Sequence, residues 1–245
     1  MSFRTVRTTP LRIMDDAHTG DHNLTPAERA YLEVIAYLEA RREPVLSVSI
    51  ARWLKVRPPT VTHMLQRLEQ KGLIRRDGGH SIALTSEGAA IAERIIRRHR
   101  LLECFLHDVV GVPWHEVHRE ATLLEPVLSS VLEARITELV GQATVSPHGN
   151  PIPGRGTPPP DDLPLVVAPV GDWFVITRID EEAGEDSCTL QFLWTHGLVP
   201  GTPLVRMHDA PGSVRIQRAG RRVILSRRVA GFLWGVVRNS GKSNV

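Results

Sequence analysis

The sequence contains little cysteine and no long apolar run. Two cysteines, Cys104 and Cys188, cannot build a disulfide framework, which favours a reducing compartment. No stretch approaches the roughly 20 apolar residues of a membrane-spanning helix. Residues 1–20 also lack the apolar core of a secretory signal. We therefore expect a cytoplasmic protein without a membrane partner.

Length and composition are those of an ordinary globular protein, but the charge is unevenly distributed. The 245 residues suffice for one large domain or two to three small ones, and 42% hydrophobic residues exclude a wholly disordered chain. Residues 24–100 carry 14 Lys and Arg against 8 Asp and Glu, whereas residues 101–147 carry 2 against 7. The basic block predicts a polyanionic partner. The acidic block either holds cations or is a solvated face.

Residues 24–86 have the pattern of a winged helix. Thr25 and Glu28 form a capping box, with a proline at the first helical position between them. The elements expected in order are helices over about 25–42, 48–54 and 58–70, and two short strands around a turn at 77–79. A helix, a helix–turn–helix and a hairpin in this order define a winged helix.

The helix expected from Pro58 to Gln70 is the candidate recognition helix. Its apolar residues share one face, and the opposite face is small and polar with few acids. We interpret that face as inserting into the major groove of double-stranded DNA. A winged helix that binds protein, or one that is only structural, is the alternative. The residues expected near base edges or phosphates are Arg57, Pro59, Thr60, Thr62 and His63.

The rest of the chain predicts a helical region and a β-rich region. Amphipathic helices over about 85–110 and 114–140 need a partner surface, and a second copy of the chain is the simplest one. A segment rich in proline and glycine then reads as a semi-rigid linker without a packed element. The short apolar runs VVAPV, WFVITRI, PLVRM, SVRIQ and RVILS, separated by turns and by one helix at about 187–196, are expected as strands and predict a small barrel.

Two sets of metal-type donors lie on the expected central helices. His99 and Glu103 share one helix face, and His118, Thr122 and Glu125 share a face of the next helix. If the two helices are antiparallel neighbours, the faces meet. Imidazole and carboxylate donors suit Mn²⁺, Fe²⁺, Co²⁺, Ni²⁺ or Zn²⁺. The alternative is that these histidines are structural, as we expect His107 and His115 to be.

Taken in order, these segments resemble the diphtheria toxin repressor family, which includes iron- and manganese-dependent regulators. The resemblance covers about 24–240, and its most specific motifs are GVPWHEVHREATLLEPVLS and SPHGNPIPG. The segments that carry it are AYLEVIAYLEA, PPTVTHMLQRLEQKGLI, LTSEGAAIAERIIRRHRLLECFL, GVPWHEVHREATLLEPVLS and SPHGNPIPG, and the later LQFLWTHGLVPGTPL looks like the family's SH3-like domain.

The resemblance implies a mainly α protein with a C-terminal β domain. It implies a homodimeric transcriptional repressor of metal-homeostasis genes that binds operator DNA and depends on Fe²⁺ or Mn²⁺, with Co²⁺, Ni²⁺ or Zn²⁺ also binding in vitro. The implied regions are a flexible tail over 1–23, a winged-helix domain over 24–86, a helical dimerisation and metal-binding domain over 87–147, a linker over 148–165 and an SH3-like domain over 166–240.

The family typically has two metal sites, and one of them is implied here by His99, Glu103 and His118. Two further donors of that site come from the SH3-like domain and fall near Asp186 and Thr189, with Glu182 and Glu185 as competitors. Such a site joins the dimer core to the SH3-like domain. We therefore expect it to order that domain without touching the DNA-binding domain.

The other family site departs sharply from the usual donor set. Its positions read Ala30, Thr122, Glu125 and Pro126, of which only Glu125 is a metal donor. Glu33 matches a carboxylate position of manganese-type members. We predict that this second site is empty or weak.

Three alternatives remain beside the repressor. The first is a DNA-binding regulator that works without metal and whose remaining donors hold at most a structural ion. The second is a metalloenzyme whose three-ligand centre has an open coordination position, although no residue suggests a general base or nucleophile and we expect no enzyme. The third is an interaction module whose SH3-like domain binds a proline-rich segment, which includes the chain's own linker.

Overall fold

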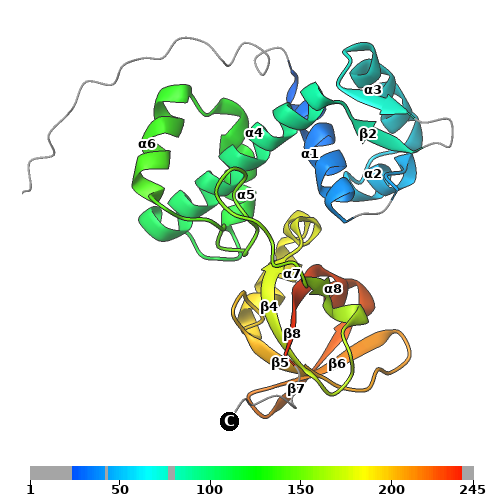
Figure 1. The fold of residues 1–245 in the computed structure, drawn as a ribbon, viewed down its shortest axis with the longest axis vertical. Helices are drawn as coiled ribbons and strands as arrows, with labels where there is room; N and C mark the ends of the chain where they lie inside the picture. The colour runs from blue at the N-terminus through cyan, green and yellow to red at the C-terminus, as the bar shows by residue number, and fades with distance from the viewer. Residues whose placement is uncertain (1–23, 42–43, 77–80, 239–245) are drawn as a thin grey trace, which may run out of the picture.

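The computed structural model describes residues 24–41, 44–76 and 81–238. The tail expected over 1–23 and the hairpin turn expected at 77–79 lie outside these residues. Three bodies follow one another along the chain, each with its own hydrophobic cluster: a winged helix, a helical body and a β-rich body (Figure 1). No helix in the described part of the chain is long and apolar enough to cross a membrane.

The first body is the winged helix that the sequence predicts. Its elements are α1 (Pro26–Ala40), α2 (Ser47–Trp53), α3 (Pro58–Gln70), β1 (Ile74–Arg76) and β2 (Ile82–Leu84). The capping box starts α1, because the Thr25 side chain accepts from the Glu28 amide and the Glu28 carboxylate accepts from the Thr25 amide at 2.7 Å. Apolar residues of all three helices, among them Leu32, Ile50 and Leu65, are buried in one core.

The second body is helical, and its second half differs from the prediction. Its elements are α4 (Ser86–Cys104), a π-helical continuation η2 (Phe105–Val110), α5 (Val117–Leu124), a 3-10 turn η3 (Glu125–Val127) and α6 (Ser130–Val140). The single helix expected over 114–140 is therefore wrong. Pro126 lacks the amide hydrogen that a continuous helix needs, and Ser129 caps a new helix by accepting from the Leu132 amide at 3.3 Å.

The third body is a six-stranded antiparallel sheet with short helices against it. Its strands are β3 (Leu163–Pro164), β4 (Trp173–Ile179), β5 (Pro203–Arg206), β6 (Ser213–Arg218), β7 (Arg221–Ser226) and β8 (Leu233–Arg238), and its helices are α7 (Ser187–Thr195) and α8 (Arg227–Phe232). The strand order is β3-β8-β4-β5-β6-β7. The run VVAPV, expected as a strand, starts in a 3-10 turn over Leu165–Val167 instead.

The segment expected as a linker without packed structure is packed in its first half. Ile152 is fully buried in the core of the helical body, and Asn150 donates from its amide side chain to the Ile179 carbonyl at 2.8 Å. Arg97 of α4 donates to the Pro153 carbonyl at 2.7 Å. The segment thus connects α4 to the end of β4, because its backbone carbonyls and one apolar side chain find partners on both bodies.

The β-rich body also contacts the winged helix directly. The guanidinium of Arg41, at the C-terminus of α1, pairs with Asp180 at 2.6 Å and with Glu182 at 2.9 Å. Lys55 Nζ, after α2, donates to the Glu185 carbonyl at 2.8 Å. We expect the metal site to order the third body without touching the DNA-binding domain, and the structure adds that the third body itself contacts that domain.

Candidate metal centre

The donors of the centre come from three parts of the chain that meet in the interior. His99 and Glu103 lie one turn apart on α4, and His118 lies on α5, which packs against α4. Glu181 begins η5 (Glu181–Glu185), a 3-10 turn that follows β4. One donor atom from each of these four residues lies within 4.8 Å of every other, and all four residues are buried.

The contacts within the cluster converge on the Glu103 carboxylate. His99 Nε2 lies 3.3 Å from Glu103 Oε1, and His118 Nδ1 lies 3.2 Å from the same oxygen. His99 Nε2 and His118 Nδ1 are 3.2 Å apart, and Glu181 Oε2 is 3.7 Å from His118 Nδ1. Two imidazole nitrogens this close to each other and to two carboxylates form a donor set suited to a divalent transition metal.

The electrostatics of the cluster reflect its burial and its mixed charges. Burial by itself lowers the pKa of His99, but the Glu103 carboxylate opposes this and raises the pKa to about 9. Burial opposes ionisation of Glu103, yet the surrounding histidines lower the pKa of this carboxyl well below its usual range. Glu103 Oε2 is buried with no hydrogen-bond partner among the described residues. A metal ion would compensate these charges and use the spare oxygen.

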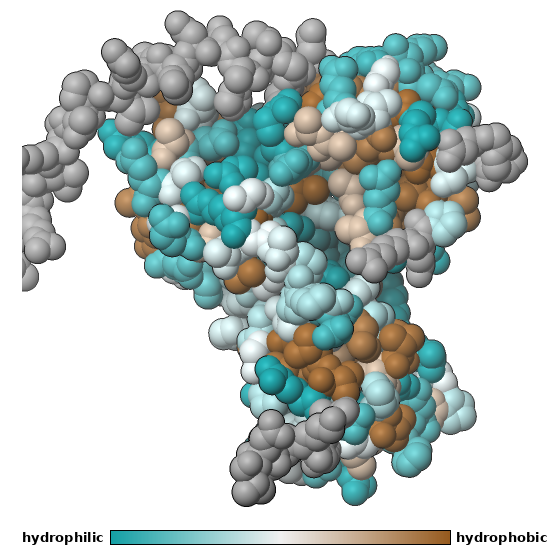
Figure 2. Space-filling model, in the orientation of Figure 1, coloured by the Kyte–Doolittle hydropathy of each residue, from teal (hydrophilic) through white to brown (hydrophobic). Residues whose placement is uncertain are grey.

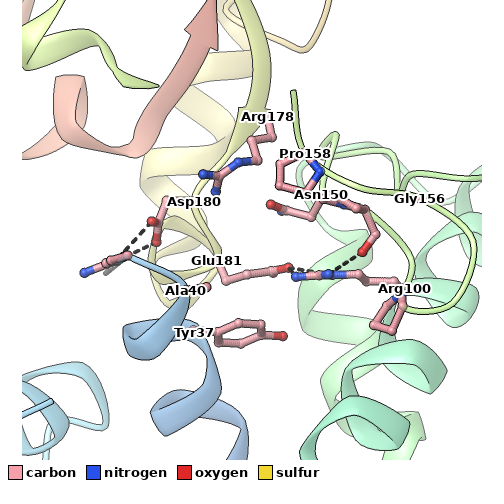
Figure 3. A pocket seen from close by; sticks show the side chains of 12 residues that line it. Tyr37, Ala40, Arg100, Asn150, Gly156, Pro158, Arg178, Asp180 and Glu181 are labelled. Atoms are coloured by element: carbon pink, nitrogen blue, oxygen red, sulfur yellow. Dashed lines mark hydrogen bonds and ion pairs between the residues drawn. The ribbon is translucent and has the colours of Figure 1, made fainter. Parts of the chain in front are cut away.

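A cleft leads from the surface to His118. It has a volume of about 220 Å³ and is lined by His118, Thr122 and Gly184, among other residues. Gly184 lies so close to the His118 ring that a Cβ there would come within 2.3 Å of ring atom Cδ2. The glycine therefore lets η5 approach α5, which brings Glu181 to the histidines. A second cavity, of about 250 Å³, is lined by Glu181, Tyr37 and Arg100, among other residues (Figure 3).

Asp186, expected in this centre, lies outside the cluster. Its carboxylate caps α7, accepting from the Cys188 amide at 3.1 Å and from the Thr189 hydroxyl at 2.8 Å. Glu181, five residues earlier, is the donor from the β-rich body that the structure brings to the histidines. The sequence does not distinguish the two, because nothing in the acidic run from 180 to 186 tells which carboxylate points toward α4.

Glu125, the remaining donor of the second predicted site, is held by cations. Arg29 of α1 lies 2.5 Å from Glu125 Oε1, and Nε of Arg98, on α4, lies 3.4 Å from the same oxygen. All three side chains are less than 10% exposed. The Thr122 hydroxyl donates to the His118 carbonyl at 2.8 Å rather than toward Glu125. Glu33 accepts from the Tyr37 hydroxyl at 2.7 Å and is not part of the cluster around Glu103. The structure thus gathers no second group of donors around Glu125 among the residues it describes.

The predicted DNA-reading residues lie together on the open face of α3. Arg57 precedes the helix, and Pro59, Thr60, Thr62 and His63 follow on its first turns, all of them exposed. Val61, Leu65 and Leu68 of the same helix are buried in the core of the winged helix. The helix is therefore anchored by one face and leaves a small, polar face free.

Comparisons with known proteins agree with this architecture. The chain matches the family models "Iron dependent repressor, N-terminal DNA binding domain" over residues 23–79 and "Iron dependent repressor, metal binding and dimerisation domain" over residues 85–154. It is 41% identical over 213 residues to the iron-dependent repressor IdeR of Mycobacterium leprae, a match covering 80% of this chain and 90% of that protein. It is 35% identical over 202 residues to IdeR of Mycobacterium tuberculosis (strain H37Rv), covering 78% and 87%.

A solved structure extends the likeness to all three bodies. A manganese-dependent transcriptional repressor, in complex with manganese, superposes with a TM-score of 0.73 at 30% identity. The match covers 86% of this chain and 100% of that one.

Metal binding should release protons in a pH range set by His99. Because its pKa of about 9 lies above the ordinary 6.5, the metal-free protein holds a proton there at pH 7. The resulting stabilisation is complete below pH 6.5 and is lost as the pH rises through about 9. A metal needs the neutral imidazole, so its affinity should increase with pH across this range. Calorimetric titration at pH 7 in two buffers of different ionisation enthalpy should give different heats, and equal heats would contradict the prediction.

Replacing Gly184 with alanine should weaken metal binding. The new Cβ collides with the His118 ring, which must shift from its place beside Glu103. We expect the dissociation constant for the metal to rise about tenfold or more, measured by competition with a fluorescent chelator. Gly231→Ala is the matched control, because nothing lies within 4 Å of a Cβ at that position. Equal affinities of the two variants would show that the ring position does not matter.

Proposed function

Because the chain belongs to the iron-dependent repressor family, we propose that it is a homodimeric transcriptional repressor controlled by a divalent metal, Fe²⁺ or Mn²⁺, that acts on metal-homeostasis genes in the cytoplasm. One observation carries the metal part of the proposal: buried donors from α4, α5 and η5 converge within 4.8 Å of one another. The relatives named above are described as repressors and not as enzymes, which weighs against a metalloenzyme.

The DNA part of the proposal rests on the winged helix and its charge. The polar face of α3 is exposed over its whole N-terminal half, as a helix that enters the major groove requires. The region 24–100 carries a clear excess of Lys and Arg, which favours binding to phosphates. The partner that fits this face is double-stranded operator DNA.

The homodimer rests on an apolar surface of the helical body. Exposed apolar side chains gather along the outer edge of this body, where α6 lies at the left of the view (Figure 2). The large apolar residues exposed on α5, η3 and α6 are Leu123, Leu124, Val127, Val131, Leu132 and Leu139. An apolar surface of this kind is costly in water. A second copy of the chain covers it by symmetry and presents two recognition helices to two half-sites.

Coupling between the metal and the DNA-binding domain runs through the acidic turn after β4. Glu181 belongs to the donor cluster of the proposed metal centre, while its neighbours Asp180 and Glu182 pair with Arg41 at the end of α1. Figure 3 shows Asp180 next to Glu181. The other oxygen of the Glu181 carboxylate, Oε1, pairs with Arg100 at 2.9 Å. A metal that binds the observed arrangement more tightly than alternatives shifts the population toward it, and so toward a fixed position of α1.

A second candidate function is a DNA-binding regulator that needs no metal. The buried pair of Arg29 and Glu125 favours it, because a guanidinium of the winged helix is held by a carboxylate of the helical body where the family has its second metal site. Breaking such a buried pair costs about 3–5 kcal/mol. The pair would therefore hold the two bodies together at any metal concentration, and the surviving centre would be structural.

The response of DNA binding to metal decides between the two candidates. We expect operator DNA from a metal-uptake gene to bind about tenfold or more tightly with Fe²⁺, Mn²⁺, Co²⁺ or Zn²⁺ than with chelator, measured by fluorescence anisotropy. Glu103→Gln should lose this gain, and Glu87→Gln, at an exposed position of the same helix, should keep it. Equal affinity with chelator and with every metal would favour the metal-independent regulator. No binding under any condition would exclude both.

Arg41→Met should separate metal binding from its effect on DNA. The substitution removes the contacts to Asp180 and Glu182 but no donor of the centre. We expect the metal-induced gain in DNA affinity to fall about tenfold, while calorimetry gives the same metal affinity as the native chain. Arg221→Met, at an exposed position of β7, is the matched control. If Arg41→Met keeps the full gain, the acidic turn does not transmit the signal.

A further inference from the structure

His148 is a buried histidine beside the metal centre to which neither the sequence motif nor the expected ligand set assigns a role. It lies in the turn that follows the helical body and is 3% exposed. Its Nε2 is 3.1 Å from the Trp114 carbonyl, and its ring meets the Trp114 ring edge-on at 4.5 Å between centroids. These contacts orient the ring, so that Nδ1 is the nitrogen directed at Glu103.

Three imidazole nitrogens surround one carboxylate oxygen. His148 Nδ1 lies 3.1 Å from Glu103 Oε1, the same oxygen that lies 3.2 Å from His118 Nδ1 and 3.3 Å from His99 Nε2. The three rings come from three separate segments of the chain. One ion pair would suffice to balance a single carboxylate. Three imidazoles aimed at one point, with a carboxylate oxygen left unpaired beside them, are the arrangement of a ligand sphere.

The backbone holds His148 and Glu181 in one unit. The His148 carbonyl accepts from the Ile179 amide at 2.8 Å, two residues before Glu181. The turn itself is closed by the Gly149 amide, which donates to the Ser146 carbonyl at 2.8 Å. Gly149 has a φ of +83° and approaches β4 so closely that a Cβ would lie 2.1 Å from the Thr177 carbonyl oxygen. The backbone thus fixes the positions of both donors relative to each other.

We propose that His148 is a ligand of the metal at this centre and that it determines which metal is preferred. The centre then offers three imidazole nitrogens, from His99, His118 and His148, and carboxylates of Glu103 and Glu181. The Trp114 carbonyl is the outer partner that keeps the ring nitrogen facing the centre free to bind, as metal-binding histidines commonly require. This inference rests on the proposed function, since it concerns the same centre.

The chemical consequence is a bias among divalent metals. Imidazole nitrogen suits Fe²⁺, Co²⁺, Ni²⁺ and Zn²⁺, whereas Mn²⁺ is best served by oxygen ligands. Affinity for a given site also generally rises from Mn²⁺ toward the later metals of the row. A third imidazole therefore favours the nitrogen-preferring metals over Mn²⁺.

The test counts the imidazoles and compares the metals. X-ray absorption of the Zn²⁺- and Co²⁺-loaded full chain should give three imidazole ligands in the native protein and two in His148→Phe. The phenylalanine ring in this variant keeps the packing against Trp114. The Zn²⁺ and Co²⁺ dissociation constants should rise about tenfold to a hundredfold in this variant, and the Mn²⁺ constant by less than threefold. His107→Phe is the matched control and should resemble the native chain, because the His107 ring contacts the Val112 carbonyl and not the metal centre.

The outcomes distinguish this inference from the proposed function. Two imidazoles in the native chain, or equal losses for all metals in His148→Phe, would overturn the assignment of His148 while leaving a metal-dependent repressor intact. Three imidazoles together with DNA binding that ignores metal would support the ligand and exclude the proposed control. A native chain that binds none of these metals would overturn both. If His148→Phe fails to fold, as judged by circular dichroism, the count in the native chain decides.

Discussion

The carboxylate of Glu103 is the group on which the arrangement of the helical body and of the turn that leads to the β-rich body depends. Its side chain is wholly buried, and an isolated charge in such a place is costly, so the chain must surround it with compensating groups. Those groups come from α4, from α5 and from the turn that precedes the β-rich body. Because one oxygen serves all of them, the helices and the turn have little freedom to move independently.

The winged helix is held to the rest of the molecule at both ends of α1. Near its N-terminus Arg29 is paired with Glu125 of the helical body, and at its C-terminus Arg41 is paired with Asp180 and Glu182 of the β-rich body. The first contact contains no metal donor of the cluster, and the second flanks one. In the proposed repressor, metal therefore acts on only some of the contacts that hold the winged helix, which limits how strongly it can shift the position of the recognition helix.

Much of the fold was predictable because its signals are local. The capping box of Thr25 and Glu28 starts α1 where expected, and the apolar spacing of α3 gives its buried and exposed faces. The prediction of secondary structure from the sequence failed where one local pattern is compatible with two structures. The apolar spacing around Pro126 fits one long helix, yet the missing amide hydrogen divides it into α5, η3 and α6. The run VVAPV is apolar enough for a strand but begins in a 3-10 turn.

The sequence by itself determined the winged helix, its polar recognition face and the pairing of His99 with Glu103, because a spacing of four residues on a helix is enough to place two side chains on one face. Only the tertiary structure decided that Glu181 rather than Asp186 joins them, that His148 points at the same oxygen, and that Glu125 faces Arg29. These choices depend on contacts between residues far apart in the chain. No local periodicity encodes the direction in which a turn or loop presents its side chains to another body.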